Sequence, residues 1–527
     1  STTVSWMKAV NVDYLKSFGD HNLNITLDAS QQDYKWTSTG VGRPILTEDP
    51  TLRYFSVTGE EKGYYELRAA YTLIGYLARV SYNFNNQYYI EGVVRRDGSS
   101  RLAPGQRFRT FPAGSIGWRI SSEKFMQNQN IVSDLKLRAG YGETGNEQTT
   151  AGWKYISIAG VVPPSYNVGN PQANNLGIAY VNFPNKDLTW EIGRTLNVGF
   201  DAVLLDNSLN FSMDYYYKKT VGIIQNVELA PTTGIQSLAD INIANVSNTG
   251  FEFQVGYTKN FGEFGFSVNA NLTTVKNQVL SLANHTALRD AGLEEGLPIG
   301  FIYGYKVGGI FQDQADIDKY NQTVDDQNST EQAPGDIYFQ NLHGDPTPGS
   351  TAVNPVPDDV LNSYDRTYLG KTIPGYYGGV TLTGTYKNFD LSLFFQGRGD
   401  VQKYNDFRAA GESMNGYGRN QFATVLNAWT PDNRNTSLPR AVYADPNDNL
   451  RYSDRFVEDA GFLRLQNLQL GYNLPQNLLR KTNSISGLRI YLTGINMFTI
   501  TNWSGLDPEN DLYPSTRQYL IGLKATF

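Results

Sequence analysis

Apolar and polar residues alternate strictly in many stretches of this chain. The run FSVNANLTT at 266–274 is one example. Because successive side chains of a strand point to opposite faces, it predicts a strand with one apolar and one polar face. The same alternation recurs at 76–84, 210–217 and 251–258, and helical spacing explains none of these runs. In the first run the apolar face holds Phe266, Val268, Ala270 and Leu272, and the polar face holds Ser267, Asn269, Asn271 and Thr273.

Applied to the whole chain, this pattern predicts fifteen strands, each long enough to cross a hydrocarbon layer when tilted. Short turns alternate with long connections near 37–70, 145–186, 279–372 and 404–459, which are rich in Pro, Asn, Asp and Gly. Bacterial outer-membrane barrels show this rhythm of short turns and long outer loops. The sequence therefore predicts an all-β, antiparallel transmembrane β-barrel. The strands are expected at 3–17, 22–36, 71–84, 87–98, 107–121, 133–144, 187–205, 208–225, 246–261, 264–278, 373–387, 390–403, 460–474, 487–499 and 515–527.

The composition and charge of the chain argue against several other classes of protein. Of the 527 residues 18% are charged, whereas soluble domains carry about 25%. The net charge of −7 argues against a nucleic-acid binder, which would show a basic face. The chain has no Cys and three His, so thiolate sites are excluded and imidazole-rich metal sites are disfavoured. No apolar run is long enough for a membrane-spanning helix. Paired carboxylates such as Asp187 and Glu191 have no pattern that places them in a cleft, so no enzyme activity is expected.

Several motifs carry a family resemblance that runs over nearly the whole chain in order. They include GYLARVSYNF at 75–84, VRRDGSSR at 94–101, FPAGSIGWRI at 111–120, LKLRAGYGETGN at 135–146 and SDRFVEDAGFLRLQNLQLGYNLP at 453–475. The pairing of NMF at 496–498 with GLDPE at 505–509 and an apolar alternation ending in Phe527 add to them. In these motifs the chain resembles the SusC/RagA-like TonB-dependent transporters of Bacteroidetes outer membranes.

The resemblance implies a fold of about the last 15 strands of a 22-stranded plugged barrel. The plug domain and the N-terminal strands are not in this chain, so an N-terminal portion of the same transporter is an expected partner. The other implied partners are a SusD-like surface lipoprotein docked on the long loops, TonB acting through the plug, and outer-membrane lipid, with no nucleic acid. The implied function is active import of a large nutrient, either a glycan or an oligopeptide. A passive porin-like channel and a secreted β-rich carbohydrate-active enzyme remain alternatives.

Charged residues opposite apolar neighbours are the candidates for the lumen wall. Arg79, Glu91, Arg95, Arg138 and Glu252 are the candidate substrate-binding positions on the strands, and Lys136 and Gln254 share the pattern. A polar lumen face is typical of outer-membrane barrels, because the lumen is wet. Each of these residues could instead form an ion pair that hydrates the channel or holds the plug.

Aromatic residues of the long loops form a second candidate set. Trp36, Trp153 and Trp429 could stack on sugar rings or peptide side chains, because an aromatic face offers apolar area with polar edges. Packing of the loops against one another or against the lipoprotein is the alternative. Tyr54, Tyr155, Tyr166 and Tyr417 belong to the same set, whereas Tyr88, Trp118, Tyr141 and Trp190 are expected in the aromatic girdles at the membrane interface.

The resemblance implies no cofactor, with a structural calcium ion in the complex left open. The family's acidic loop of the DxNGDG kind corresponds to HGDPT at 343–347, which lacks most of the acidic residues. A second acidic segment, DQADID at 313–318, lacks the Gly and the terminal Glu of a dedicated calcium loop. It predicts the start of a short helix at 314–322 instead. No metal-ligating residues are therefore assigned.

Overall fold

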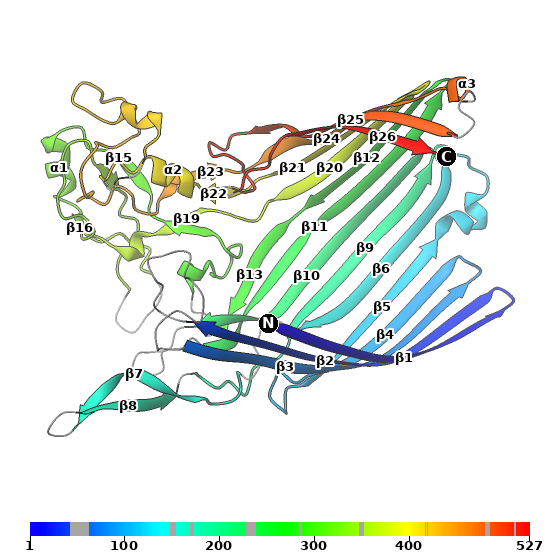
Figure 1. Ribbon diagram of the computed structural model, residues 1–527, viewed down its shortest axis with the longest axis horizontal. Helices are drawn as coiled ribbons and strands as arrows, with labels where there is room; N and C mark the ends of the chain where they lie inside the picture. The colour runs from blue at the N-terminus through cyan, green and yellow to red at the C-terminus, as the bar shows by residue number, and fades with distance from the viewer. Residues whose placement is uncertain are drawn as a thin grey trace, which may run out of the picture. The chain divides into compact units, whose positions relative to one another are not determined.

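The computed structural model describes residues 1–42, 63–147, 154–168, 173–180, 182–227, 239–283, 287–346, 353–416, 418, 420–479, 485–510 and 513–527. Most of the regular structure is strand (Figure 1). The strands are β1 (Thr2–Phe18), β2 (His21–Gly42), β3 (Gly63–Phe84), β4 (Tyr88–Ser99), β5 (Phe108–Arg119), β6 (Val132–Asn146), β7 (Ala159–Val168), β8 (Ala173–Tyr180), β9 (Glu191–Leu204), β10 (Leu209–Val227), β11 (Ala239–Phe261), β12 (Phe264–Thr274), β13 (Lys276–Leu282), β14 (Ile302–Gly304), β15 (Val307–Ile310), β16 (Asp325–Asp326), β17 (Ile337–Phe339), β18 (Val360–Leu361), β19 (Thr367–Gly370), β20 (Tyr376–Tyr386), β21 (Phe389–Gly399), β22 (Gln402–Tyr404), β23 (Val457–Asp459), β24 (Phe462–Asn473), β25 (Gly487–Thr501) and β26 (Gln518–Thr526). The α-helices are α1 (Gln314–Tyr320), α2 (Asp406–Gly411) and α3 (Gln476–Leu479).

Sixteen strands hydrogen-bond into one sheet in the order β1-β2-β3-β4-β5-β6-β9-β10-β11-β12-β20-β21-β24-β25-β26, with β13 paired to β11 beside this path. The fifteen strands of the path are the fifteen that the alternation predicts, so the all-β antiparallel fold class is confirmed. The predicted helix at 314–322 is also present, as α1. Among the described residues, no helix is both long enough and apolar enough to span a membrane.

The connection expected at 37–70 is shorter than predicted. Strand β2 continues to Gly42 and β3 begins at Gly63, and the two pair in an unbroken antiparallel register up to that point. The polar residues of 37–42 look like loop residues in the sequence. They form strand because their antiparallel pairing with residues 63–68 satisfies their backbone N–H and C=O groups.

The chain divides into two compact units. The first comprises Ser1–Lys124, Lys136–Val198 and Lys218–Asn245, and the second comprises Phe125–Leu135, Gly199–Tyr217 and Val246–Phe527. In the first unit, strands β1 to β6 follow one another as antiparallel neighbours. The turn between β3 and β4 is tight: Asn85 and Asn86 both adopt positive φ, and the Gln87 N–H donates to the Phe84 backbone oxygen at 2.9 Å.

A small apolar cluster in the first unit corrects one of the predicted girdle positions. Trp190 is buried and packs edge-on against Phe111, with 5.6 Å between ring centroids. Its indole Nε1 donates to the backbone oxygen of Arg107 at 3.0 Å. The girdle prediction for Trp190 is therefore wrong, because the ring is buried in an apolar cluster that includes residues of β5 and β10. The cluster consists of Leu102, Phe111, Leu188, Trp190 and Ile224.

The other three predicted girdle residues are exposed. Tyr88, Trp118 and Tyr141 each expose more than a third of their surface. The Tyr88 hydroxyl and the Trp118 indole both donate to the Glu123 carboxylate, at 2.7 and 3.0 Å. An aromatic side chain with its polar end fixed at a strand terminus suits the boundary between lipid and water.

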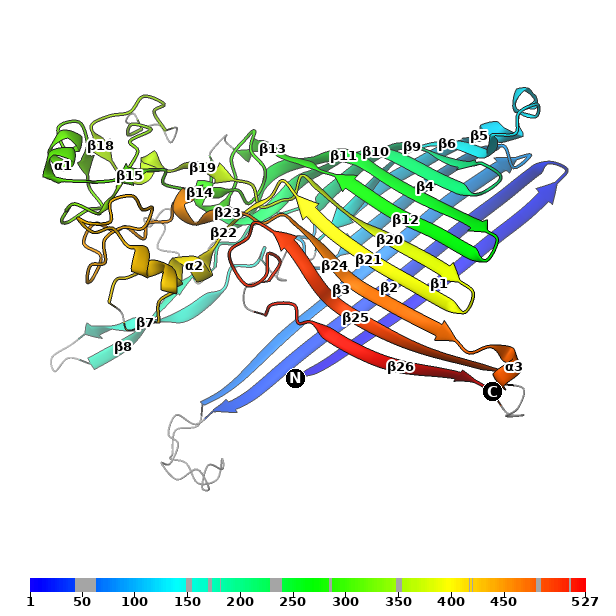
Figure 2. The same cartoon turned by 90° about the horizontal axis from the view of Figure 1, so that it is seen from above.

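In the second unit, β12, β20, β21, β24, β25 and β26 lie side by side (Figure 2). Their register segregates the two faces. Val268 lies opposite Tyr257 on β11 and Leu382 on β20, whereas its neighbour Asn269 lies opposite Gly256 and Thr381. The apolar and polar faces predicted for 266–274 are therefore continuous across neighbouring strands.

This segregation predicts how the wall responds to charge. Val268→Arg should lower the free energy of unfolding by about 2 to 4 kcal/mol, because the predicted transmembrane barrel would hold this cation on its lipid face near the bilayer midplane. Asn269→Arg, one residue further on, should cost much less, since its side chain leaves the opposite face. The free energies of unfolding of the two variants are measured by urea titration, with the folded fraction followed as the heat-modifiable band on a gel. Equal destabilisation by the two variants would refute the assignment of the faces.

Candidate functional site

The polar face of the first unit carries ion pairs. Arg79 on β3 and Glu91 on β4 form a salt bridge in which Arg79 Nε donates at 2.9 Å, and both side chains are partly exposed. On β4 the Arg95 guanidinium holds both Asp97 carboxylate oxygens at 2.8 Å. This pair lies over Gly75, where an added Cβ would stand 2.6 Å from Arg95 Nη2. Three of the predicted wall residues are thus ion-paired.

The Arg95–Asp97 pair opens into a cavity of about 270 Å³ in the first unit. Ser30, Gln32 and Glu147 also line it. Glu147 accepts from Arg101 at 3.0 Å, and burial raises the pKa of this carboxyl, although the Arg101 charge opposes the shift. The cavity therefore offers both a guanidinium and carboxylates, an arrangement that can bind a zwitterionic or hydrogen-bonding ligand.

The remaining candidates lie at separate places. Arg138 lies on β6, in register with Gly117 on β5, and Glu252 lies exposed on β11 in register with Thr273. Trp36 is half-buried on β2, in register with Ala69, two residues beyond the Tyr34 ring that stacks on Tyr71. Trp153 lies outside the described residues, as do Tyr54 and Tyr417. The side chain of Tyr166 is also outside the description, whereas the Tyr155 hydroxyl accepts from Arg107 at 3.4 Å.

Trp429 is buried inside folded loop structure. Only 7% of its surface is exposed, and its indole Nε1 donates to Gln312 at 3.1 Å. Gly335 packs directly against the ring. This is the packing role that the sequence leaves as an alternative to ligand stacking, and a ring in this position has no free face for a sugar.

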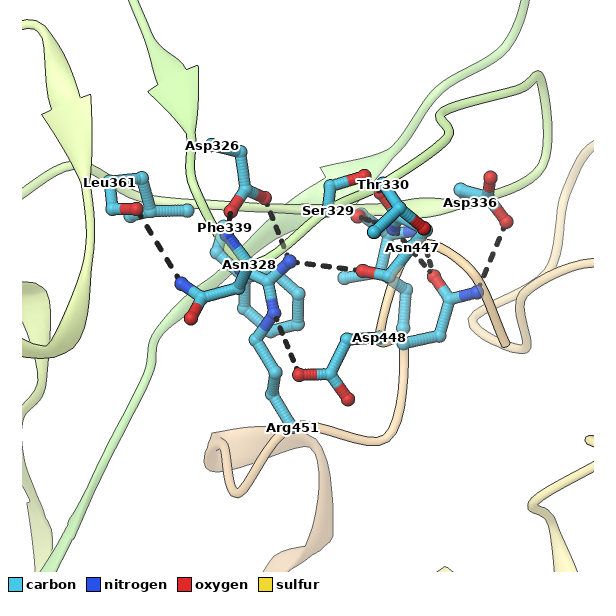
Figure 3. A network of polar contacts seen from close by, with 12 residues as sticks. Asp326, Asn328, Ser329, Thr330, Asp336, Phe339, Leu361, Asn447, Asp448 and Arg451 are labelled. Carbon is cyan, nitrogen blue, oxygen red and sulfur yellow. Dashed lines mark hydrogen bonds and ion pairs between the residues drawn. The ribbon is translucent and has the colours of Figure 1, made fainter. Parts of the chain in front are cut away.

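The long connections 279–372 and 404–459 fold together within the second unit. We call the described residues of 302–370 and 402–459 the loop lobe. Its apolar core joins Tyr305, Ile337, Phe339 and Leu361. Around this core lies a polar network that links residues 326–336 to residues 445–451 (Figure 3). The first connection supplies the apolar core, and each connection supplies one half of the polar network.

Two buried carboxylates organise the network. Asp326 and Arg451 are each about 2% exposed and form an ion pair at 2.8 Å. The Arg451 guanidinium also lies 4.3 Å from the centre of the Phe339 ring. Asp336, fully buried, accepts from Arg440 Nε at 2.8 Å and from the Asn449 amide at 3.1 Å. These ion pairs bring together residues of both connections, since Asp326 and Asp336 belong to the first and Arg440, Asn449 and Arg451 to the second.

A third ion cluster ties the segment after β25 to the wall. Arg464 on β24 donates to Asp507 at 2.9 Å and to Glu509 at 2.7 Å. Burial alone would raise the pKa of Asp507, but the backbone N–H groups of Glu509 and Ser515 and the Arg464 guanidinium outweigh it and lower the pKa to about 2. The GLDPE motif therefore supplies ligands for one buried arginine. Pattern reasoning identified the motif but did not predict its partner.

The described residues of the acidic loop, 343–346, are held by hydrogen bonds to neighbouring carboxylates. Asp365 is fully buried and accepts the backbone N–H groups of Leu342 and His343, while Asp358 accepts that of Asp345 at 2.9 Å. In the part of the chain that the structure describes, no group of three or more acidic or His side chains is placed to hold a metal. The described residues therefore offer no candidate ligand set for the structural calcium ion that the sequence leaves open.

The polar face of the second unit differs from that of the first, because it is uncharged over a wide area. One row across β11, β12, β20 and β21 reads Gln254, Asn271, Gly379 and Gln396. The next reads Gly256, Asn269, Thr381 and Phe394. The third reads Thr258, Ser267, Thr383 and Ser392. We call these three rows the neutral band.

A family model matches residues 3–497, and its description reads TonB dependent receptor-like, beta-barrel. Among curated proteins, TonB-dependent receptor P3 of Formosa agariphila is 30% identical over 98% of this chain and 51% of its own length. TonB-dependent receptor SusC of Bacteroides thetaiotaomicron is 29% identical over 98% of this chain and 50% of its own length. The chain thus spans about half the length of the curated relatives it matches.

Solved structures agree on the fold. A structure titled as the RagAB peptide transporter matches all of this chain with a TM-score of 0.81, 24% identity and 56% of the matched chain covered. A second, titled as the RagAB peptide importer in the closed-closed state, matches with the same TM-score, 25% identity and the same coverage. The barrel fold expected from the alternation of short turns and long loops is therefore confirmed.

Proposed function

Because the chain belongs to the TonB-dependent receptor-like β-barrel family, as the match over residues 3–497 shows, we propose that it forms the wall of an energised importer. Family members of this kind are proteins of the outer membrane. The nutrient would be a glycan or an oligopeptide too large for a passive pore. The chain would contribute the barrel strands and outer loops, and the remaining half of the transporter would contribute the plug that TonB acts on.

The observation that carries this proposal is the two-faced wall. One face is apolar and continuous, as at Val268 and Leu382, while the other carries the Arg79–Glu91 and Arg95–Asp97 pairs in the first unit and the neutral band in the second. A secreted soluble enzyme would not need an apolar outer face. Ion pairs along a wet lumen also give a plug fixed partners to contact, which an open porin does not require.

The loop lobe is the proposed docking surface for a surface lipoprotein of the SusD or RagB kind. Leu426 and Tyr443 project from it with 86% and 76% of their surfaces exposed. Exposed large apolar groups of this kind mark protein interfaces when they gather on one surface. Deleting either long connection alone is a poor test of docking, because each holds half of the buried network that folds the other.

The test separates energised import from passive flow. The complex is purified from its native membrane, and mass spectrometry identifies the material that co-purifies with it. Uptake of that material by cells should stop when TonB is deleted or a protonophore is added, since opening of the plug needs energy. Continued uptake under both conditions would favour the passive porin. A denatured mass measurement of the same complex should reveal a polypeptide with plug sequence and a lipoprotein.

A further inference from the structure

The neutral band differs from the rest of the polar face because it contains no charged residue. Its twelve positions include amides, hydroxyls, glycines and one phenyl ring, and no charged residue. On the first unit the polar face carries Arg79, Glu91, Arg95 and Asp97 within a comparable stretch of two strands. A wall that only needed to be wet could use either kind of residue. The neutral band is therefore a chemically distinct surface.

The polar groups of the band are largely unused by the protein. In the described part of the chain, the amides of Gln254 and Asn269 and the hydroxyl of Thr381 make no hydrogen bond to another residue, although neighbouring Asn271 accepts the backbone N–H of Gly379 at 3.0 Å. Gln254 and Asn269 are exposed. Each amide offers two donors and an acceptor, so the band presents a dense array of both kinds.

A hollow of about 420 Å³ lies along the band. Asn269, Thr381 and Phe394 line it, and Asn210 and Ser212 of β10 extend it on one side. Gly379 shapes its floor, because a Cβ there would stand 3.0 Å from the Phe394 ring. The glycine thus lets the ring lean along the wall, where it offers an apolar face beside the amides.

The charges that border the band are mostly paired. Asp390 binds Arg489, whose Nε donates to it at 3.1 Å, and Arg464 is held by Asp507 and Glu509. Arg398 donates to the backbone oxygen of Pro508 at 2.8 Å. In the described part of the chain, neither Arg398 nor Glu252 bonds to a side chain of opposite charge, and Asp201 accepts from the hydroxyl of Ser212 at 2.8 Å. Within the band itself, a strongly charged ligand would find no side chain of opposite charge.

We propose that the neutral band binds an uncharged polyhydroxylated chain, that is, a neutral oligosaccharide. Sugar hydroxyls donate and accept at once, so they match amides and hydroxyls without requiring a charge. The C–H face of a pyranose ring packs on an aromatic face such as that of Phe394. This inference rests on the proposed function, because it takes the polar face to line the import path, and it narrows the substrate from glycan or oligopeptide to neutral glycan.

The test uses the complete transporter in detergent with its N-terminal portion and lipoprotein. Calorimetric titrations with maltohexaose, xylohexaose and mannohexaose are compared with hexagalacturonate and hexaalanine. At least one neutral oligosaccharide should bind and the two comparators should not. Asn269→Asp, which keeps the shape and removes the donors, and Phe394→Ala should each weaken that binding by about tenfold or more. Thr385→Ala, on the same face of β20 but beyond the band, is the matched control and should leave the affinity unchanged.

Three results would overturn the inference. The first is binding of the charged oligosaccharide or the peptide alone, and the second is binding of a neutral one that ignores both variants. The third is crosslinking from a photoreactive residue at position 254 to the plug portion both with and without sugar. That result would show that the band contacts the plug. Heat-modifiability confirms that each variant folds. If TonB-dependent uptake of another nutrient is unaffected by the variants, this binding site is refuted and the proposed function stands. If the transporter binds the sugar but its uptake does not depend on TonB, the proposed function is refuted and the binding site stands.

Discussion

Arg451→Met should destabilise the loop lobe by about 3 to 5 kcal/mol, because it leaves the Asp326 carboxylate buried without its cation. Asp326 is 2% exposed, and no other basic side chain among the described residues bonds to it. The Met side chain can still cover the Phe339 ring, so the loss is electrostatic and not a loss of volume. Hydrogen exchange of the backbone amides at 337–339 in the intact complex measures the free energy of local opening.

Two further variants give this prediction its controls. Arg451→Met combined with Asp326→Leu removes both charges and should recover most of the stability, since a buried ion pair replaced by apolar groups is often neutral or better. Glu263→Gln breaks the pair with Lys387, whose side chains are 68% and 55% exposed, and should cost less than about 1 kcal/mol. If Arg451→Met opened the lobe no more readily than Glu263→Gln, the network would not be what holds the two connections together.

The strands could be predicted from the sequence because lipid imposes the pattern. A residue such as Val268 has to be apolar whatever its neighbours are, so alternation survives in each strand by itself. The match extends to strand ends where a tight turn marks them, as at Asn85 and Asn86. It fails at 37–42 and 63–70, where the β2–β3 hairpin continues as regular strand although the sequence there does not alternate.

The loop lobe could not be predicted, because its contacts join residues far apart in sequence. Asp326 and Arg451 are separated by 125 positions, and each alone looks like a solvated loop charge. The roles of Trp190 and Trp429 could not be predicted for the same reason: an aromatic residue near a strand end or in a long loop has the same local sequence whether it contacts lipid, ligand or another loop. Burial decides among these, and it depends on the partner segment.

A register shift explains why the Arg464 cluster also escaped prediction. The pairing of β24 with both neighbours is irregular between Leu465 and Asn467, so an extra residue breaks the alternation there. Arg464 then lies beside Gln396 and Thr499, on the polar face, where it reaches Asp507. The GLDPE motif indicated that the segment mattered, but only the structure identifies the arginine that it binds.

Residues 1–527 expressed without any other portion of the transporter should not form a heat-modifiable barrel. In the described part of the chain, β1 pairs with β2 alone and β26 pairs with β25 alone. Each therefore presents one edge of unpaired N–H and C=O groups, and in hydrocarbon every such group costs several kcal/mol. Since the chain spans about half of its relatives' length, we propose that strands from the other half pair with both edges.

Co-expression of the N-terminal portion as a separate polypeptide should restore a protease-resistant, heat-modifiable band, because the missing edge pairs need no covalent link to form. A complete transporter cleaved just before Ser1 after assembly is the matched control and should stay folded. The prediction applies most strongly to β1, because all seventeen of its residues are exposed in this chain by itself. Apolar side chains such as Trp6 and Val10 need lipid on one face of this strand. A monomeric, heat-modifiable barrel formed by residues 1–527 alone would show that β1 and β26 can close on each other, and the proposal that other strands complete the wall would fall.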